Sequence, residues 1–188
     1  MFQKNILLLH SSFYPMTVKN LMIFSVILLL ISGCGYGLVG QGNLPDHIKT
    51  IAIPIFVNKT PEEGVEEVIT QQVIEQFVKG GKVRLVSEGN ADAVLKGTIK
   101  GYSANTVASY DENNEVASYK LYVTVDIELT DMVNGEILWQ TQGLVEDQDF
   151  DGGPLVNITQ ETENEERALR ELAEELAQRI RTLSTEGF

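Results

Sequence analysis

Hydrophobic and polar residues alternate most regularly between Tyr119 and Leu129. One side of this segment is apolar and the other is polar, since Tyr119, Leu121, Val123, Val125, Ile127 and Leu129 alternate with Lys120, Tyr122, Thr124, Asp126 and Glu128. A two-residue period is typical of a strand in an antiparallel sheet that is covered on one side. Asn134-Gly135 then gives a strong hairpin-turn signal, so the pattern predicts a further strand from Glu136 to about Val145.

Two other segments show the spacing of amphipathic helices. Thr60 is the predicted N-cap of the first helix, Pro61 its first residue, and Gly80-Gly81 its end. The second helix is predicted from about Thr162 to Leu183. Their apolar positions recur at three- and four-residue intervals: Val65, Val68, Ile69, Val73 and Phe77 in the first, and Leu169, Leu172, Ala173, Leu176, Ile180 and Leu183 in the second.

Three weaker strand patterns are found before Tyr119, at residues 48–57, 82–87 and 93–103. Pro54 places the first of them at a sheet edge or creates a bulge. The sequence therefore predicts an α+β fold, a two-layer sandwich in which two amphipathic helices pack on one face of a mostly antiparallel sheet of four to five strands. We expect residues 48–188 to form this single domain.

The N-terminal segment has the form of a bacterial lipoprotein signal. Its apolar run of about 11 residues, Leu21–Ile31, is shorter than the roughly 20 that span a bilayer as a helix, and it fits a signal peptide. Small residues then lead into Cys34, the only cysteine of the chain. We expect residues 1–33 to be the signal peptide, with translation starting at Met16, Cys34 to carry the lipid, and residues 34–47 to be a tether.

The composition narrows the classes of function. The chain has a formal net charge of −13, and removal of residues 1–33, which contain two lysines and no acidic residue, would leave −15. This charge argues against binding to nucleic acid and against adsorption to anionic lipid. His47 would be the only histidine of the processed chain, and acylation of Cys34 would leave no thiol. We therefore expect no enzyme, no metal centre and no cofactor.

One acidic motif is similar to a calcium-binding loop. Residues 147–152 read Asp-Gln-Asp-Phe-Asp-Gly, which matches the first half of such a loop, but the twelfth position is Ile158 where a bidentate Glu is needed. The pattern favours a solvated acidic loop that joins the last strand to the last helix. Calcium binding by Asp147–Asp151 is the alternative.

Three lysines are the candidate binding residues. Lys96, Lys100 and Lys120 fall on the polar side of two predicted neighbouring strands. Lysines in such places either protect and solubilise an exposed sheet or form a local positive patch on an acidic protein.

Several segments resemble the LptE family of lipopolysaccharide-assembly lipoproteins. The resemblance is carried by the lipoprotein signal with Cys34-Gly35-Tyr36-Gly37-Leu38, by Ile51-Ala52-Ile53-Pro54-Ile55-Phe56-Val57-Asn58-Lys59-Thr60, by Tyr119-Lys120-Leu121-Tyr122-Val123-Thr124-Val125, and by Asn164-Glu165 through Ile180. It covers essentially the whole chain after Cys34.

This resemblance implies a non-enzymatic lipoprotein, anchored in the outer membrane and facing the periplasm. Members of the family plug the large β-barrel LptD, support its assembly and help to deliver lipopolysaccharide to the cell surface. They also contact lipopolysaccharide phosphates through basic residues. The turn Asp111–Glu115 is acidic where better-known members carry a basic residue. The lipopolysaccharide contacts left by the resemblance are therefore Lys96, Lys100 and Lys120, or a divalent cation that bridges acidic groups to phosphate.

The segment Ile51–Thr60 also looks like the first strand of CsgG-like or TolB N-terminal-type domains. Such a domain would make the protein a cell-envelope scaffold or a secretion-associated lipoprotein. A CsgG-like pore subunit needs additional membrane-inserting hairpins, and the 155 residues from Cys34 to Phe188 leave little room for them.

Overall fold

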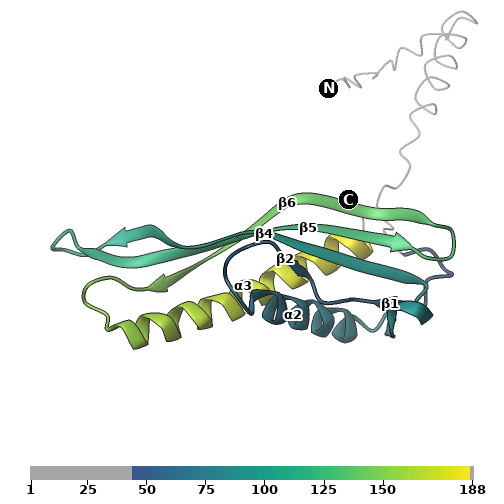
Figure 1. Cartoon of the computed structure of the whole chain (residues 1–188), viewed down its shortest axis with the longest axis horizontal. Helices are drawn as coiled ribbons and strands as arrows, with labels where there is room; N and C mark the ends of the chain where they lie inside the picture. The colour runs from purple at the N-terminus through teal and green to yellow at the C-terminus, as the bar shows by residue number, and fades with distance from the viewer. Residues whose placement is uncertain (1–43, 187–188) are drawn as a thin grey trace, which may run out of the picture. The chain divides into compact units, whose positions relative to one another are not determined.

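Three long strands dominate the computed structural model, which describes residues 44–186 (Figure 1). They are β4 (Ala93–Tyr110), β5 (Val116–Asp131) and β6 (Glu136–Asp151). Each pairs antiparallel with the next along the chain, so that β5 lies between β4 and β6. The predicted alternation from Tyr119 to Leu129 lies within β5, the central strand of this meander.

Short strands extend the sheet on the β4 side. β1 (Thr50–Ala52) lies between β3 (Arg84–Leu85) and β4 and is parallel to both, while β2 (Val57–Asn58) pairs parallel with β4 further along. A short 3₁₀ helix, η1 (Glu88–Asn90), leads into β4. The sheet is therefore mixed and has six strands where four to five were predicted. The additional strand comes from the division of the first predicted strand into β1 and β2, while β3 lies within the strand predicted at residues 82–87.

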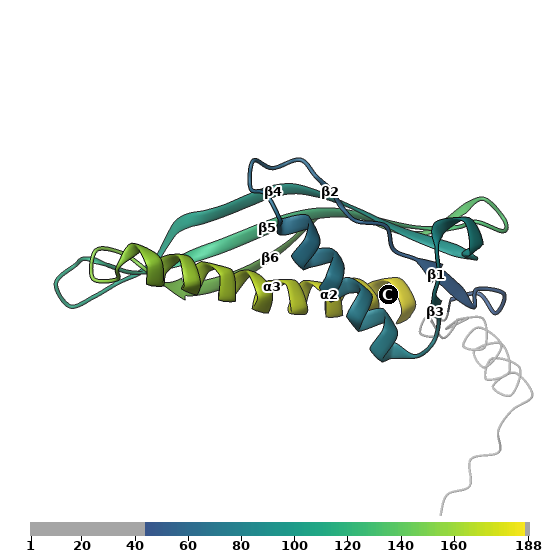
Figure 2. The same ribbon diagram turned by 60° about the horizontal axis from the view of Figure 1, so that its bottom comes forward.

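Two helices cover one face of the sheet, α2 (Val65–Gly80) and α3 (Ile158–Glu186). Figures 1 and 2 show α3 running along the long strands, with α2 beside it. The α+β class and the two-layer arrangement predicted from the sequence are confirmed.

The core lies between the sheet and the two helices. On β5, the side chains of Leu121, Val123, Val125, Ile127 and Leu129 are all buried. They belong to one cluster with the predicted apolar stripes, including Ile69, Val73 and Phe77 of α2 and Leu172, Leu176 and Ile180 of α3. Burial of these side chains supplies the main driving force for the fold.

The single strand predicted over residues 48–57 is interrupted. It forms β1 and β2 with an irregular segment between them, where Pro54 has no N–H for a ladder. In this segment the Phe56 amide donates to the Thr70 hydroxyl of α2 at 2.9 Å, so a helix side chain replaces a strand partner.

The first helix starts later than predicted. Asn58 Oδ1 accepts hydrogen bonds from the amide and the hydroxyl of Thr60, at 2.9 and 2.8 Å. This local turn uses the groups that were predicted to cap a helix. Gly64, with φ of 86°, then precedes the first helical residue, Val65. The sequence signal was therefore a turn signal, and the prediction of Thr60 as the N-cap was wrong.

The segment that enters the domain, residues 44–47, lies against it. Leu44 is partly buried and packs against the core. His47 Nε2 lies 2.7 Å from Asp131 Oδ2 at the end of β5. Of the segment predicted as a tether, these four residues are the ones that the structure describes, and they are held in place.

Candidate functional site

The three candidate lysines form a row on the polar face of the sheet, the face opposite the helices. On β4, Lys96 lies opposite Glu128 of β5. Lys100, also on β4, lies at a register shift just before Gly101, which pairs with Thr124. Lys120 lies on β5, opposite Thr106. These levels are four residues apart along β5, which corresponds to roughly 13 Å between successive lysines. The lysine row therefore follows the strands, and its side chains do not converge on one small anion.

Each lysine of the row has acidic partners. Lys96 Nζ lies 3.8 Å from Glu88 Oε1, and Lys100 Nζ lies 3.5 Å from Asp126 Oδ2. Lys120 Nζ lies 2.7 Å from a carboxylate oxygen of both Asp147 and Asp149. The three cations thus face four carboxylates, so the row adds no net positive charge to this face.

Lys120 is the most strongly held member of the row. Hydrogen bonds to Asp147 and Asp149 raise the pKa of its ammonium group above the usual value. Its side chain is 27% exposed, against 60% for Lys96 and 47% for Lys100. A phosphate at this position would have to compete with two carboxylates that are already in contact.

The acidic motif at residues 147–151 is part of a strand. β6 continues to Asp151, and Asp147, Asp149 and Asp151 lie opposite Tyr122, Lys120 and Ser118 of β5. The prediction of a solvated loop was therefore wrong, because the strand pairing continues past Val145. Within residues 44–186 no group of three or more His, Cys, Asp or Glu side chains is arranged to hold a metal ion.

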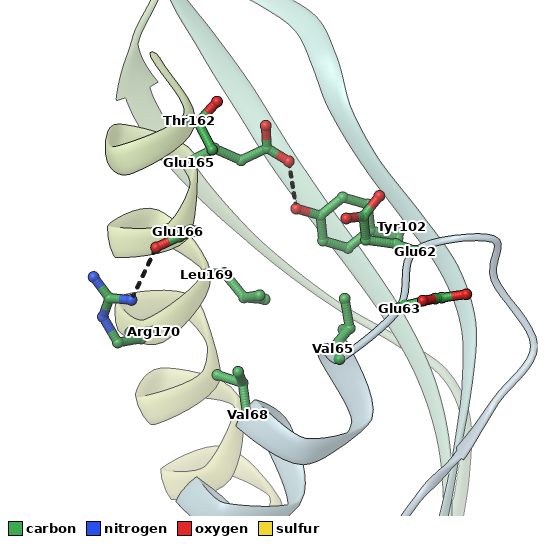
Figure 3. A pocket seen from close by; sticks show the side chains of 11 residues that line it. Glu62, Glu63, Val65, Val68, Tyr102, Thr162, Glu165, Glu166, Leu169 and Arg170 are labelled. Atoms are coloured by element: carbon green, nitrogen blue, oxygen red, sulfur yellow. Dashed lines mark hydrogen bonds and ion pairs between the residues drawn. The ribbon is translucent and has the colours of Figure 1, made fainter. Parts of the chain in front are cut away.

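A cleft lies on the other face of the sheet, between β4, the start of α2 and the first half of α3 (Figure 3). Its volume is about 390 Å³. Val65, Val68 and Leu169 give it an apolar floor, and Tyr102 projects into it from β4. The Tyr102 hydroxyl donates to Glu165 Oε1 of α3 at 2.6 Å. Burial and this hydrogen bond to a carboxylate raise the pKa of Tyr102 above its usual value.

The mouth of this cleft is acidic. Glu62, Glu63, Glu165 and Glu166 line it together with one cation, Arg170, which lies 3.9 Å from Glu166. Four carboxylates beside one guanidinium repel phosphate and other anions. The cleft is therefore unsuited to lipopolysaccharide phosphates. The Tyr102–Glu165 contact fixes α3 to β4.

Sequence reasoning missed the contacts between distant residues. Tyr102 and Glu165 are separated by 63 positions, and His47 and Asp131 by 84. A helical glutamate and a tyrosine near the end of a predicted strand carry no signal that they will meet. Lys120 and its two aspartates were both singled out from the sequence, but only the register of β5 with β6 brings them together.

The predicted lipidation site, Cys34, lies outside the described residues. Among the helices of residues 44–186, none combines the length and the apolar character needed to cross a membrane.

Solved structures of other bacterial proteins are similar to this chain. A minor lipoprotein from Acinetobacter baumannii is 18% identical, with 74% of this chain and 93% of that chain covered and a TM-score of 0.51. A rare lipoprotein B from Shewanella oneidensis is 16% identical over 70% of this chain and 90% of that chain, with a TM-score of 0.47. A dodecamer of a PelC variant from Paraburkholderia phytofirmans is 16% identical over 76% of this chain and 93% of that chain, with a TM-score of 0.45. The likeness to the first protein shows a shared fold.

At the level of sequence, no curated protein matches the chain. The sequence model of the LptE family, described as lipopolysaccharide-assembly, matches residues 48–183. This range includes every strand and nearly all of both helices, and it confirms the resemblance seen in the sequence. The chain therefore belongs to the LptE family of lipopolysaccharide-assembly proteins.

Proposed function

We propose that this protein is a lipid-anchored outer-membrane lipoprotein that plugs an LptD-like β-barrel, supports the assembly of that barrel and assists lipopolysaccharide delivery. Cys34 carries the lipid, and the domain faces the periplasm. The family supports the lipopolysaccharide-assembly role. The remaining parts rest on the lipoprotein signal and on the surface of the domain.

The observation that carries the plug proposal is the polar face of the sheet. The lumen of a large barrel is polar, so a plug needs a rigid body with polar surfaces. Here the exposed sheet face carries lysines paired with carboxylates, while the apolar side chains of β5 are turned towards the helices. The exposed face of α3 is also charged, with ion pairs such as Glu146–Arg179 at 3.1 Å.

Site-specific crosslinking in native outer membrane tests this proposal. A photoreactive residue replaces either Thr98, on the polar sheet face, or Glu174, on the exposed side of α3, in the full lipidated chain. A plug is surrounded, so both positions should crosslink to the same large β-barrel. A probe at the buried Leu129 is the matched control and should give no crosslink. Recovery of the protein alone, or with periplasmic secretion components, contradicts the proposal and favours the CsgG- or TolB-type scaffold.

Lipopolysaccharide contact by the lysine row stays a prediction. Reversal of charge at Lys96, Lys100 and Lys120 together would leave the four carboxylates around them unpaired and repel phosphate. If the row binds lipopolysaccharide, this triple variant loses binding. Charge reversal at Lys79, in the last turn of α2, and at Lys82, just after that helix, does not reduce binding. Unchanged binding by the triple variant excludes the lysines. Loss of binding on removal of divalent cations would then assign the contact to a cation bridge.

A further inference from the structure

The turn between β5 and β6 presents apolar side chains to solvent. Met132 is 52% exposed and Val133 is 63% exposed, and Ile137 follows at the start of β6 with 52%. The rest of the turn is Asn134 and Gly135, so the tip carries no charge between Asp131 and Glu136. A small apolar tip with a polar collar matches a surface that enters the lipid–water interface without crossing it.

The chain enters the domain beside this same turn. His47 Nε2 contacts Asp131 Oδ2 at 2.7 Å, and the Asn134 side-chain amide donates to the same carboxylate at 2.9 Å. The other oxygen of Asp131 accepts the Val133 amide at 2.8 Å. The Asp131 side chain is only 1% exposed, so its carboxylate depends on these partners for hydrogen bonds.

A second carboxylate fixes the next residues of the entering chain. Asp92 Oδ2 accepts hydrogen bonds from the amides of Lys49 and Thr50, at 2.9 and 2.8 Å. The Met132 amide donates to the Asp92 carbonyl at 2.8 Å. The entry point and the apolar tip are therefore parts of one rigid end of the molecule, which Figure 1 shows at the β1 end of the sheet.

The length of the chain before the domain limits how far this end can lie from an anchored Cys34. The ten residue steps from Cys34 to Leu44 reach at most roughly 35 Å when fully extended. The β4–β5 hairpin lies at the other end of β5, whose 16 residues rise by roughly 50 Å. The β5–β6 turn is therefore an apolar protrusion within reach of an anchored Cys34, and the β4–β5 hairpin lies farther from the anchor along the sheet.

We propose that Met132 and Val133 of the β5–β6 turn enter the membrane interface beside the lipid anchor, so that the domain stands on the membrane by this end. This inference rests on the lipidation of Cys34 in the proposed function. The surface that the apolar tip enters is a zwitterionic lipid membrane. Glu136 follows the tip and Asp46 precedes the entering His47, and both are exposed, which disfavours anionic headgroups.

A fluorescent probe at the tip tests the proposal. With Cys34 acylated, a cysteine introduced by Val133→Cys is the sole thiol, and it can carry an environment-sensitive dye. The matched control is Tyr110→Cys at the β4–β5 hairpin, where Tyr110 is 60% exposed. Both full-length lipidated proteins are placed on phosphatidylcholine vesicles, with and without nitroxide groups on the lipid chains. For the dye at position 133, we expect a several-fold rise in emission when the protein binds unlabelled vesicles, and strong quenching on vesicles that carry nitroxide groups. For the dye at position 110, we expect neither change.

A second variant separates the tip from the anchor. Met132→Asp in the Val133→Cys background should abolish the nitroxide quenching while the protein still floats with vesicles. Equal quenching at positions 133 and 110, quenching at 110 alone, or quenching unchanged by Met132→Asp overturns the proposal. A dye at position 133 that is shielded from water without nitroxide quenching also overturns the proposal. That result would mean that another segment of the chain covers the tip.

Flotation distinguishes this inference from the proposed function. Wild-type protein that floats, while Cys34→Ala does not, supports the anchor, and an unquenched dye at 133 then removes the tip inference alone. Wild-type protein that fails to float contradicts the anchor and overturns both. The barrel crosslinks from Thr98 and Glu174 test the plug independently of either result.

Discussion

The two halves of β4 have different surroundings although they form one continuous strand. Residues 93–99 pair with β5 on one side and with β1 and β2 on the other, and most of them are buried. Residues 101–110 pair with β5, and three register shifts interrupt that pairing. None of the side chains in this second half is buried. Figure 1 shows the outer part of the β4–β5 hairpin extending past the helices.

This difference separates the length of a strand from its contribution to stability. Residues 101–110 contain no charged residue and include Val107 and Tyr110, so they suit a strand. Their contribution to the core is small, since Tyr102 and Ala104 pack against it while only partly buried. Bulges along an exposed edge also discourage pairing with another chain. We therefore expect the first half of β4 to carry stability and the second half to be the less stable part of the sheet.

The largest effect is expected from truncation of an apolar side chain in the first half. Leu95 is fully buried opposite Leu129, and Leu95→Ala should lower the free energy of unfolding by about 3 kcal/mol through lost contacts and a cavity. The matched change in the second half, Val107→Ala, removes a side chain that is 39% exposed and should cost less than about 1 kcal/mol. Urea unfolding of both variants measures the difference. Equal losses of unfolding free energy in the two variants would mean that the helices do not make the first half of β4 more stable than the second.

The two glycines of β4 give a second, somewhat smaller contrast. A Cβ at Gly97 would overlap the ring of Phe56, which is 2% exposed and cannot move into solvent. Gly97→Ala should therefore cost about 2 kcal/mol by overpacking. At Gly101 the nearest atom to such a Cβ is Thr124 Oγ1 at 3.5 Å, an ordinary contact, so Gly101→Ala should be close to neutral.

A compensating change tests the cause of the Gly97 effect. Phe56→Leu in the Gly97→Ala background provides space for the new methyl group and should recover part of the lost stability. Denaturant unfolding of the single and double variants forms a cycle. Strictly additive losses would show that the Phe56 ring is not the obstacle.

The sequence predicted the covered part of this fold better than the uncovered part. The alternation along β5 and the apolar stripes of both helices indicated the core correctly, because burial imposes a period on the sequence. The ends of β4 and β6 were placed too early, at Ser103 and about Val145. Beyond these points the apolar pattern is sparse: β4 has no buried side chain after Ser103, and β6 has one after Val145, that of Phe150, between two aspartates.

The candidate site shows the same limit. Lys96, Lys100 and Lys120 were placed correctly on the polar face by their position in the alternation. Their acidic partners come from η1, β5 and β6, and the register that brings these together cannot be read from one segment. A row that looked positive in the sequence is therefore neutralised in the structure.

Asp131 of β5 lies opposite Ala93, the first residue of β4. Its carboxyl predicts a pH-dependent difference in stability between the two ends of β4. Burial alone would raise the pKa of this carboxyl, but hydrogen bonds from the Asn134 amide, His47 and the Val133 amide outweigh burial and lower its pKa to about 2 from an ordinary value of 3.8. A folded-state pKa below the unfolded value means that the ionised group stabilises the fold above the ordinary value. This stabilisation is lost as the pH falls from 3.8 towards 2.

Asp131→Asn should therefore lower stability at neutral pH, and its difference from the wild type should shrink as the pH approaches 2. The control is Asp111→Asn in the β4–β5 turn, where the Glu115 and Asn113 amides also lower the pKa of the carboxyl. Because that turn lies beyond the core, its substitution should change global unfolding less. Urea unfolding at several pH values distinguishes the two. A difference between Asp131→Asn and wild type that stays constant down to pH 2 would contradict the assignment.

The smallest effect is expected at Lys120, which lies opposite Thr106 in the second half of β4. Its two short ion pairs with Asp147 and Asp149 are partly open to solvent, with side-chain exposures of 27%, 46% and 57%. Exposed pairs contribute little, because water screens them and the side chains lose freedom. Lys120→Met should therefore cost less than about 1 kcal/mol in global unfolding.

Amide hydrogen exchange gives a more local measurement, since it reports opening of the hairpin without unfolding of the core. Faster exchange confined to the strand ends around Thr106 and Asp149, with no change near Leu95, is the expected result. Faster exchange throughout the sheet would mean that the two halves of β4 unfold together, and that the contrast between them does not extend to their stability.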